Sequence, residues 1–149
     1  MWCRFAYVLA VTGFGAFAQT PCEQLKMLKL TGMAITLAES KAAGPLQNSS
    51  KPAAPAAQTL PAYCRVAATL KPTSDSDIKM EVWLPASLAW NGKFEAVGGG
   101  GWAGVISYPA MASALQDGYA ASSTDTGHEA RNADFAVGHP EKVIDWATA

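Results

Sequence analysis

The sequence predicts a mixed α/β fold in which antiparallel strands come first and a strand–helix–strand–helix run follows. Apolar and polar residues alternate with period two between residues 64 and 84, as they do in half-buried strands. Four glycines at 98–101 follow a short apolar segment, and apolar residues beyond them recur at helical spacing. The 149 residues, 50% of them hydrophobic, are enough to form one globular core.

Residues 1–18 have the pattern of a secretory signal peptide. Arg4 supplies the positive charge, Phe5–Phe17 is apolar, and Ala16-Phe17-Ala18 is a small-x-small cleavage site. The apolar stretch is shorter than the roughly 20 residues of a membrane span. We therefore expect a secreted or periplasmic mature chain, 19–149, with no membrane contact after cleavage. An uncleaved anchor or a buried first helix is the alternative.

Export decides how the cysteines are interpreted. Cys3 would leave with the signal peptide, so Cys22 and Cys64 remain as a pair. In an oxidising compartment the default for such a pair is a disulfide. The alternative is two separate buried thiols, or cysteines whose partners are lost from the chain.

The first elements are predicted as follows. Pro21 suits the start of a short helix over 22–30, and a short strand over 33–38 follows the glycine that ends it. The stretch 44–61 is a Pro/Ala-rich surface loop, whose prolines argue against regular structure. Two half-buried strands then flank the polar turn 72–77, which makes them antiparallel. Their predicted buried residues are Cys64, Val66, Ala68 and Leu70 in the first and Ile78, Met80, Val82 and Leu84 in the second, opposite Lys79 and Glu81.

The second half of the chain is predicted to alternate strands and helices. A strand over 93–97 enters the glycine run, and Pro109 opens a helix that ends near Gln116. A strand over 119–124 follows, and Pro140 precedes a last helix over 141–147. This order matches the opening of the α/β-hydrolase sheet, and the chain ends before the G-x-S-x-G nucleophile elbow of that fold.

The glycine run is the main candidate for a functional site. Consecutive glycines let the backbone approach a ligand, and free N–H groups there can bind an anion. In the α/β-hydrolase order this loop contributes an N–H to the oxyanion hole. The candidate residues are Gly99, Gly100 and Gly101. A purely structural turn is the other interpretation.

The same glycines also fit a dinucleotide-binding pattern. Gly99, Gly101 and Gly104 spell G-x-G-x-x-G, and Asp125 follows about 20 residues later. Against this pattern, Pro109 delays the helix and antiparallel strands precede the motif. An exported protein also meets little NAD.

One cluster of polar side chains and one separate histidine are given structural roles. Ser122, Ser123, Asp125 and His128 lie too close along one strand end for an imidazole to sit between hydroxyl and carboxylate. We expect Asp125 and His128 to form a buried hydrogen-bond cluster that fixes the bend after the strand. His139 is expected to be a capping or surface residue.

Charge and histidine content exclude several partners. The net charge is −1 and the basic residues form no cluster, so no nucleic-acid partner is expected. Two histidines, with neither C-x-x-C nor H-E-x-x-H spacing, argue against a zinc site, and no cofactor is expected in this chain.

A series of motifs resembles the N-terminal part of the tannase and feruloyl esterase family, which includes hydrolases of the mono-hydroxyethyl-terephthalate type. The motifs are Leu60-Pro61-Ala62-Tyr63-Cys64-Arg65-Val66, Glu81-Val82-Trp83-Leu84-Pro85, Trp90-Asn91-Gly92-Lys93-Phe94, the glycine run, Ser123-Thr124-Asp125-Thr126-Gly127-His128 and Gly138-His139-Pro140-Glu141-Lys142. The resemblance implies a secreted serine carboxylesterase on an α/β-hydrolase core, which cleaves esters of phenolic or aromatic acids. Members carry a Gly-Cys-Ser-x-Gly-Gly elbow, a distant Asp and His, and a lid that often holds calcium.

Only part of the family's machinery has counterparts in residues 19–149. The resemblance implies that Gly100 or Gly101 donates the oxyanion N–H and that Cys22 and Cys64 are the family's N-terminal cysteine pair. The catalytic serine, acid and base, the lid and any calcium ligands have no counterpart. We therefore expect an N-terminal portion of the catalytic domain that is inactive alone, with a small aromatic ester as substrate of the full-length form. The alternative is a non-catalytic remnant or binding module.

Overall fold

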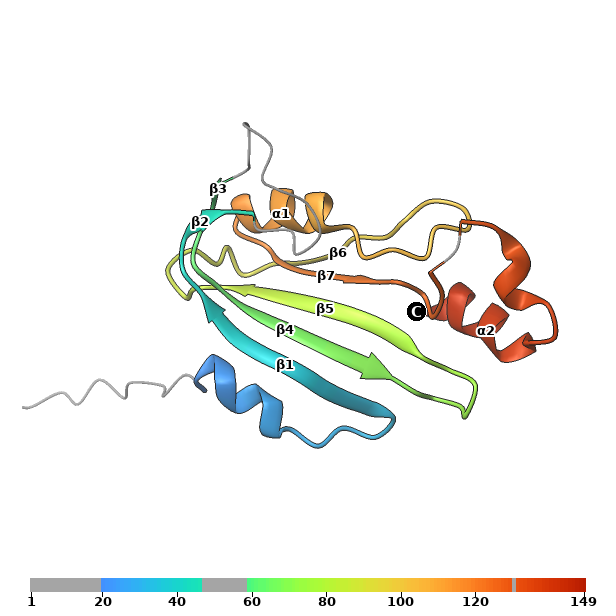
Figure 1. The fold of residues 1–149 in the computed structure, drawn as a ribbon. Helices are drawn as coiled ribbons and strands as arrows, with labels where there is room; N and C mark the ends of the chain where they lie inside the picture. Colours follow the sequence, from blue (N-terminus) through green and yellow to red (C-terminus); the bar gives the residue numbers. More distant parts are fainter. Residues whose placement is uncertain (1–19, 47–58, 130) are drawn as a thin grey trace, which may run out of the picture.

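A five-stranded sheet organises the chain, with strand order β1-β4-β5-β7-β6 (Figure 1). The computed structural model describes residues 20–46, 59–129 and 131–149, so the expected signal peptide lies outside the described residues. β4 (Tyr63–Leu70) pairs antiparallel with β1 (Met33–Lys41) on one side and with β5 (Ile78–Pro85) on the other. The antiparallel pairing of β4 and β5 was predicted from the polar turn between them.

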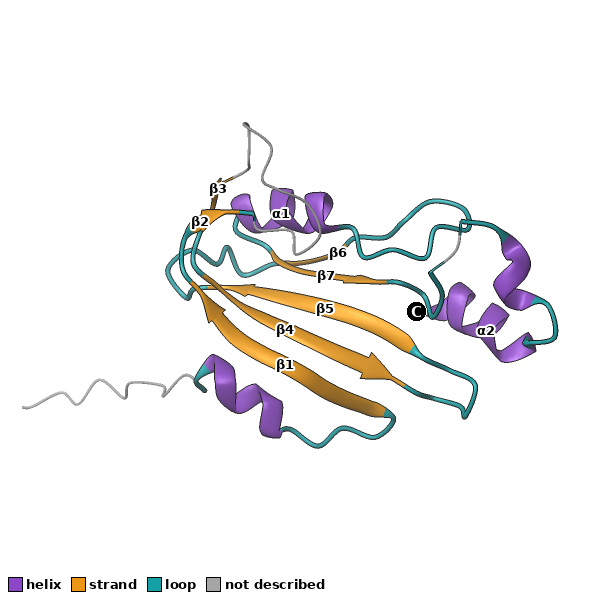
Figure 2. Cartoon of the chain, in the orientation of Figure 1, coloured by secondary structure: helices purple, strands orange, loops and turns teal. Residues whose placement is uncertain are grey.

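The second half of the sheet follows the predicted strand–helix–strand order (Figure 2). β6 (Phe94–Ala96) and β7 (Ala120–Thr124) are parallel neighbours, and α1 (Tyr108–Gln116) connects them. β7 also pairs antiparallel with β5, which joins the two halves into one sheet. Gly118 ends α1 with φ +81°, a conformation that suits glycine, and a Cβ there would lie 2.8 Å from a backbone oxygen. The mixed α/β class is thereby confirmed.

Two predicted boundaries near the N-terminus were wrong. The helix expected over 22–30 is a 3-10 helix, η1 (Cys22–Met27), because Leu28 already has extended backbone angles. The strand expected over 33–38 continues to Lys41, since its pairing with β4 extends to Tyr63.

The loop expected over 44–61 contains regular structure at both of its ends. β2 (Gly44–Pro45) and β3 (Thr59–Leu60) pair antiparallel, and the residues between 46 and 59 lie outside the described part. Leu60 is buried in the core beneath α1, so this end of the loop contributes to packing.

The core lies between α1 and the sheet. Met111, Ala112, Ala114 and Leu115 of the helix pack with Leu60, Trp83 and Ala121. Trp83 also contacts two tyrosine rings, with centroid distances of 4.9 Å to Tyr63 and 6.1 Å to Tyr108. The prediction for β5 was therefore wrong at its C-terminal half. Glu81 and Trp83 are buried, whereas Met80, Val82 and Leu84 are only half-buried.

Glu81 is buried because four donors surround its carboxylate. Oε2 accepts from Arg65 Nε and from Trp83 Nε1, each at 2.8 Å. Oε1 accepts from Tyr108 Oη at 2.9 Å and from Arg65 Nη2. Arg65 also approaches Glu39, with Nη1 3.4 Å from Oε1, so the network joins β1, β4, β5 and the first turn of α1.

This network predicts acid sensitivity. Burial tends to raise the pKa of Glu81, but hydrogen bonds from Arg65, Trp83 and Tyr108 outweigh it, so the pKa lies below its ordinary 4.5. The ionised carboxylate then stabilises the fold above about pH 4.5, and this contribution is lost as pH falls through the lower folded value. Comparing the free energy of unfolding of Glu81→Gln and wild type between pH 7 and pH 3 should show the wild-type advantage shrinking. A constant difference would contradict the prediction.

A disulfide fixes η1 to the sheet face opposite α1. Cys22 and Cys64 are bonded across 42 residues of sequence, as predicted. Cys64 alternates along β4 with Tyr63 and Arg65, which face the α1 side. Within the described residues, no helix has the length and apolar character that a membrane crossing requires.

Removing this disulfide should destabilise the chain strongly. A bond that closes a loop of this length restricts the unfolded chain, which is worth about 4 kcal/mol in the chain-entropy model. We expect the Cys22→Ser/Cys64→Ser double variant to unfold at a correspondingly lower urea concentration. Dithiothreitol should shift wild type similarly and leave the double variant unchanged, and equal urea midpoints for both proteins would contradict the prediction.

Candidate functional site

A cavity of about 450 Å³ lies where the parallel strands β6 and β7 end. The glycine run forms one side of it, and residues from the end of β7 form another. The carboxyl ends of parallel strands are the usual position of binding sites in α/β sheets. Its lining residues are Ala96, Val97, Gly98, Gly99, Gly101, Ala103, Ser122, Ser123, Thr124, Thr126, Trp146 and Ala149.

The glycine run ends in a tight turn. Ala103 N–H donates to the Gly100 carbonyl at 3.2 Å, and Gly101 between them has φ +58°. Positive φ at the second position alone is typical of a type II′ turn, which favours glycine there. The backbone N–H groups of Gly98 to Trp102 donate to no other described residue. Of these residues, Gly98, Gly99 and Gly101 line the cavity, where such N–H groups could bind a ligand.

Gly104 fixes the far end of the loop. A Cβ on this residue would lie 2.0 Å from the carbonyl oxygen of His128, so only glycine allows the two backbones to approach this closely. The glycine loop, residues 98–104, is thus packed against the segment that follows β7.

Asp125 and His128 lie at that segment, as the sequence indicated, but each has its own partners. Asp125 Oδ1 accepts from the backbone N–H groups of Lys79 and Gly127, both at 2.9 Å. Burial raises the pKa of Asp125, while these two N–H groups work against the shift. His128 Nε2 lies 3.0 Å from the Trp102 carbonyl oxygen, and Nδ1 lies 3.2 Å from Thr126 Oγ1. The carboxylate and the imidazole are therefore not bonded to each other.

The two serines complete no catalytic relay. Ser123 Oγ accepts from the backbone N–H of Ser107 at 3.0 Å, just before α1. Ser122 lines the cavity from β7 without a hydrogen bond to either imidazole. His139 precedes α2 (Pro140–Thr148) and makes no side-chain cap bond; its Nδ1 lies 2.9 Å from Asp75 Oδ2 at the surface.

Three aromatic residues at the site were not predicted. The Trp102 ring is tilted against that of Trp146 in α2, with ring centroids 4.3 Å apart, and lies 6.0 Å from Phe135 of η2 (Ala133–Ala136). Phe135 in turn stacks on His128 at 3.8 Å. The only sequence signal was the tryptophan inside a glycine run, because the other rings are 33 and 44 positions away along the chain.

The dinucleotide interpretation does not fit this geometry. α1 begins at Tyr108, four positions after the last motif glycine, so its N-terminus is not part of the loop. The Asp125 carboxylate, which would have to bind a ribose, is occupied by two backbone N–H groups. In residues 20–46, 59–129 and 131–149 no group of three or more His, Cys, Asp or Glu side chains could hold a metal ion.

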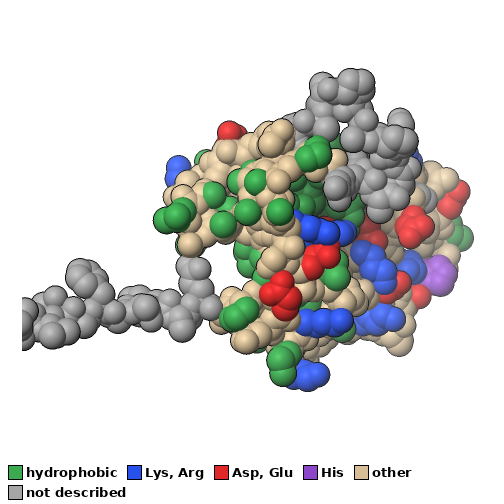
Figure 3. Space-filling view, turned by 60° about the vertical axis from the view of Figure 1, so that its left-hand side comes forward, with side chains coloured by type: hydrophobic (Ala, Val, Ile, Leu, Met, Phe, Trp, Pro, Cys, Tyr) green, Lys and Arg blue, Asp and Glu red, His purple; other side chains and the backbone are tan. Residues whose placement is uncertain are grey.

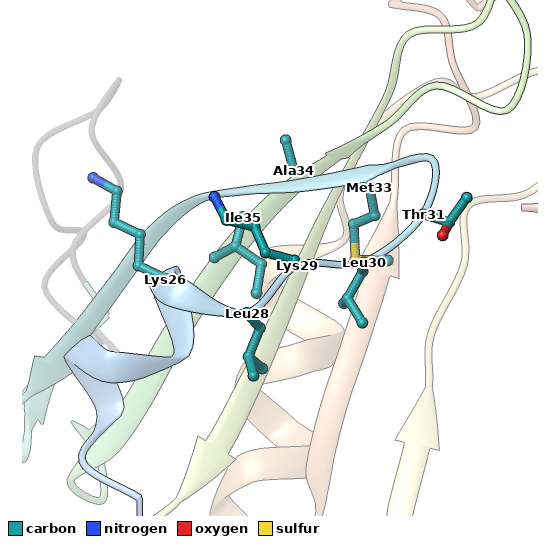
Figure 4. Close-up of a pocket in the computed structure, with 8 residues that line it drawn as sticks. All are labelled: Lys26, Leu28, Lys29, Leu30, Thr31, Met33, Ala34 and Ile35. Carbon is teal, nitrogen blue, oxygen red and sulfur yellow. The ribbon is translucent and has the colours of Figure 1, made fainter.

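The other hollows offer less for a reaction. A cavity of about 520 Å³ has Glu81 and Asp125 in its lining, but both carboxylates already accept hydrogen bonds within the fold. A hollow of about 340 Å³ between η1 and the start of β1 is lined by two lysines but by no carboxylate or histidine (Figure 4). On the face shown in Figure 3, acidic and basic side chains are interspersed, and no extended patch has a single sign. The cavity at the glycine loop is therefore the candidate site.

Comparison with known proteins gives this site a family context. A family model described as tannase and feruloyl esterase matches residues 64–149. An uncharacterized esterase of Xanthomonas campestris pv. campestris is 41% identical over 133 residues, which are 88% of this chain and 22% of that protein. A probable feruloyl esterase B-1 of Aspergillus terreus is 37% identical over 84 residues, which are 56% of this chain and 16% of that protein.

The structural similarity agrees with these matches. The crystal structure of feruloyl esterase B from Aspergillus oryzae superposes with a TM-score of 0.74 and 31% identity, covering 86% of this chain and 25% of that one. The chain thus spans about a fifth of the length of the curated relatives it matches. With a family-model match over more than half its length and the same fold, this chain belongs to the tannase and feruloyl esterase family.

Proposed function

We propose that this chain forms the N-terminal part of a secreted serine carboxylesterase that hydrolyses esters of phenolic or aromatic acids. Family membership supports an ester hydrolase, and the feruloyl esterase names of relatives favour the phenolic substrate. The observation that carries the proposal is the glycine loop. Its N–H groups have no acceptor among the described residues, and Gly98, Gly99 and Gly101 line a cavity at the ends of β6 and β7.

The role of the loop is to stabilise negative charge. When a nucleophile attacks an ester carbonyl, the carbonyl oxygen becomes an oxyanion, and backbone N–H groups held at about 2.7–3.1 Å lower the barrier. Gly99, Gly100 and Gly101 are the proposed donors. The serine nucleophile, its acid and its base would come from sequence beyond these 149 residues.

The disulfide supports the proposed export. Such bonds persist in oxidising compartments and are rare in the reducing cytosol. We propose cleavage after Ala18, which places Cys22 near the mature N-terminus. Intact-mass analysis of exported protein should show a chain that begins at Gln19, and a mass that retains residues 1–18 would contradict the cleavage.

The 149-residue chain alone is expected to hydrolyse neither methyl ferulate nor methyl gallate above background. Both of its histidines are bonded elsewhere, and the Thr126 hydroxyl near His128 donates to the Asp125 carbonyl at 2.7 Å. A chimera should be active if this chain replaces the matching N-terminal segment of Aspergillus oryzae feruloyl esterase B.

Two outcomes would contradict this assignment. Reaction of the isolated chain with a fluorophosphonate probe, mapped to Ser122, Ser123 or Thr126, would reveal a nucleophile inside the chain. A chimera that folds, as judged by near-UV circular dichroism, but hydrolyses no ester would argue for a non-catalytic role. The parental Aspergillus enzyme serves as the positive control.

A further inference from the structure

Three successive carbonyl groups of the glycine loop each accept a hydrogen bond. The Gly100 carbonyl accepts from Ala103 N–H at 3.2 Å, within the turn. The Gly101 carbonyl accepts from Trp146 Nε1 at 3.2 Å, and the Trp102 carbonyl from His128 Nε2 at 3.0 Å. The last two donors are side chains outside the loop, one from α2 and one from the segment after β7.

These side chains belong to a packed aromatic group. The Trp102 ring contacts both Trp146 and Phe135, and Phe135 stacks on the His128 ring with an interplanar angle of 14°. We call His128, Phe135 and Trp146 the aromatic clasp. In Figure 1 the segment that carries it lies beside the loop connecting β6 to α1.

The helix that carries Trp146 is itself attached to the sheet. Asp145, the neighbouring residue in α2, is buried, and its Oδ1 accepts from Ser76 Oγ at 3.1 Å. Ser76 lies in the turn between β4 and β5 and is also buried. Through α2, the clasp therefore connects the glycine loop to the buried end of the β4–β5 turn.

From this geometry we infer that His128 and Trp146 are positioning residues that hold the glycine loop in its anion-binding shape. Each carbonyl shares a planar peptide with the N–H of the next residue. Bonds to the carbonyls of Gly100, Gly101 and Trp102 thus fix three successive peptide planes, including the one that carries the Gly101 N–H. This inference rests on the proposed oxyanion role of the loop. In it, His128 and Trp146 keep the donor N–H groups in position without contacting the substrate themselves.

The neutral form of His128 fits this role in one tautomer. Only a carbonyl oxygen faces Nε2, so Nε2 must carry the proton, which leaves Nδ1 beside the Thr126 hydroxyl. Glutamine can donate from a similar position through its amide, whereas leucine fills the space without a donor. The pair His128→Gln and His128→Leu therefore separates the hydrogen bond from simple packing.

The first test measures loop order in the disulfide-bonded 149-residue chain. We expect ¹⁵N order parameters of residues 98–103 near the rigid value of about 0.85 in wild type and His128→Gln, and below about 0.6 in His128→Leu. Trp146→Phe, which keeps an aromatic ring but removes the indole N–H, should also loosen the loop. Trp90→Phe is the matched control, because Trp90 donates to the Lys93 carbonyl at 2.9 Å, outside the loop.

The outcomes are distinct. Unchanged order in both His128→Leu and Trp146→Phe would overturn the inference, and if His128→Leu fails to fold, Trp146→Phe alone decides. In the chimera, we expect the loosening variants to lower kcat about tenfold or more with little change in KM, because small misplacements of catalytic groups are costly. His128→Gln and Trp90→Phe should keep kcat. A chimera with no activity counts against the proposed function and leaves the order measurement valid.

Discussion

Replacing Glu81 by alanine is expected to lower the free energy of unfolding by about 3–5 kcal/mol, the range seen when one partner of a buried ion pair is removed. Glu81 is 3% exposed and its carboxylate is the common acceptor for Arg65, Trp83 and Tyr108. Without it, four donor groups on these three side chains lose their acceptor, and the Arg65 guanidinium keeps the longer contact to Glu39. Urea unfolding at pH 7 measures the change.

The matched control is an ion pair near the same strand that is exposed. Asp77 lies 2.6 Å from Lys79, and about half of each side chain is accessible. Solvent screens such pairs, so Asp77→Ala should cost less than about 1 kcal/mol. Replacing the buried pair together, as Arg65→Met/Glu81→Leu, should recover much of the stability because no charge is left unpaired. Equal losses for Glu81→Ala and Asp77→Ala would show that the buried network contributes little.

Glu81 also shows why period-two patterns predict strands better than faces. The alternation correctly placed β5 and its antiparallel pairing with β4. It assigned the buried face to Met80 and Val82 because these are apolar and Glu81 is charged. Which face of β5 is buried depends on α1, which covers Trp83, and on Arg65. Arg65 lies opposite Trp83 on β4 and neutralises the Glu81 carboxylate. The contact between Arg65 and Glu81 depends on the register of β4 against β5, and the sequence pattern of a single strand does not give that register.

The sequence predicted the place of the candidate site but not the side chains that pack around it. Glycines after a short apolar strand predicted a loop next to a binding site, and the structure places a cavity beside them. The Cys22–Cys64 pairing was predicted because these two cysteines remain once Cys3 is assigned to the expected signal peptide. The aromatic clasp could not be predicted, because Phe135 and Trp146 reach Trp102 only through the path of the chain after β7. The assignment of Gly99–Gly101 as oxyanion donors remains a prediction.

In the chimera, Gly101→Pro should lower kcat by about 10²–10³-fold with little change in KM, the effect of losing one oxyanion donor. Gly101 lines the cavity, its N–H donates to no described residue, and its φ is +58°. Proline removes the N–H and requires φ near −65°, so it eliminates the donor and opens the turn at once. The loss is expected in kcat because the oxyanion exists only in the transition state and the intermediate.

Gly44→Ala, a glycine substitution in β2 outside the glycine loop, is the control for this variant. It keeps its N–H, its φ is not in the left-handed region, and a Cβ there would meet no atom within 4 Å. Its kcat should stay close to that of the parent chimera. Rates are compared per active site, titrated with a fluorophosphonate, so that a folding defect lowers the titre and a catalytic defect lowers the rate. If Gly101→Pro reduces only the titre, the loop acts as a structural turn and the oxyanion assignment is wrong.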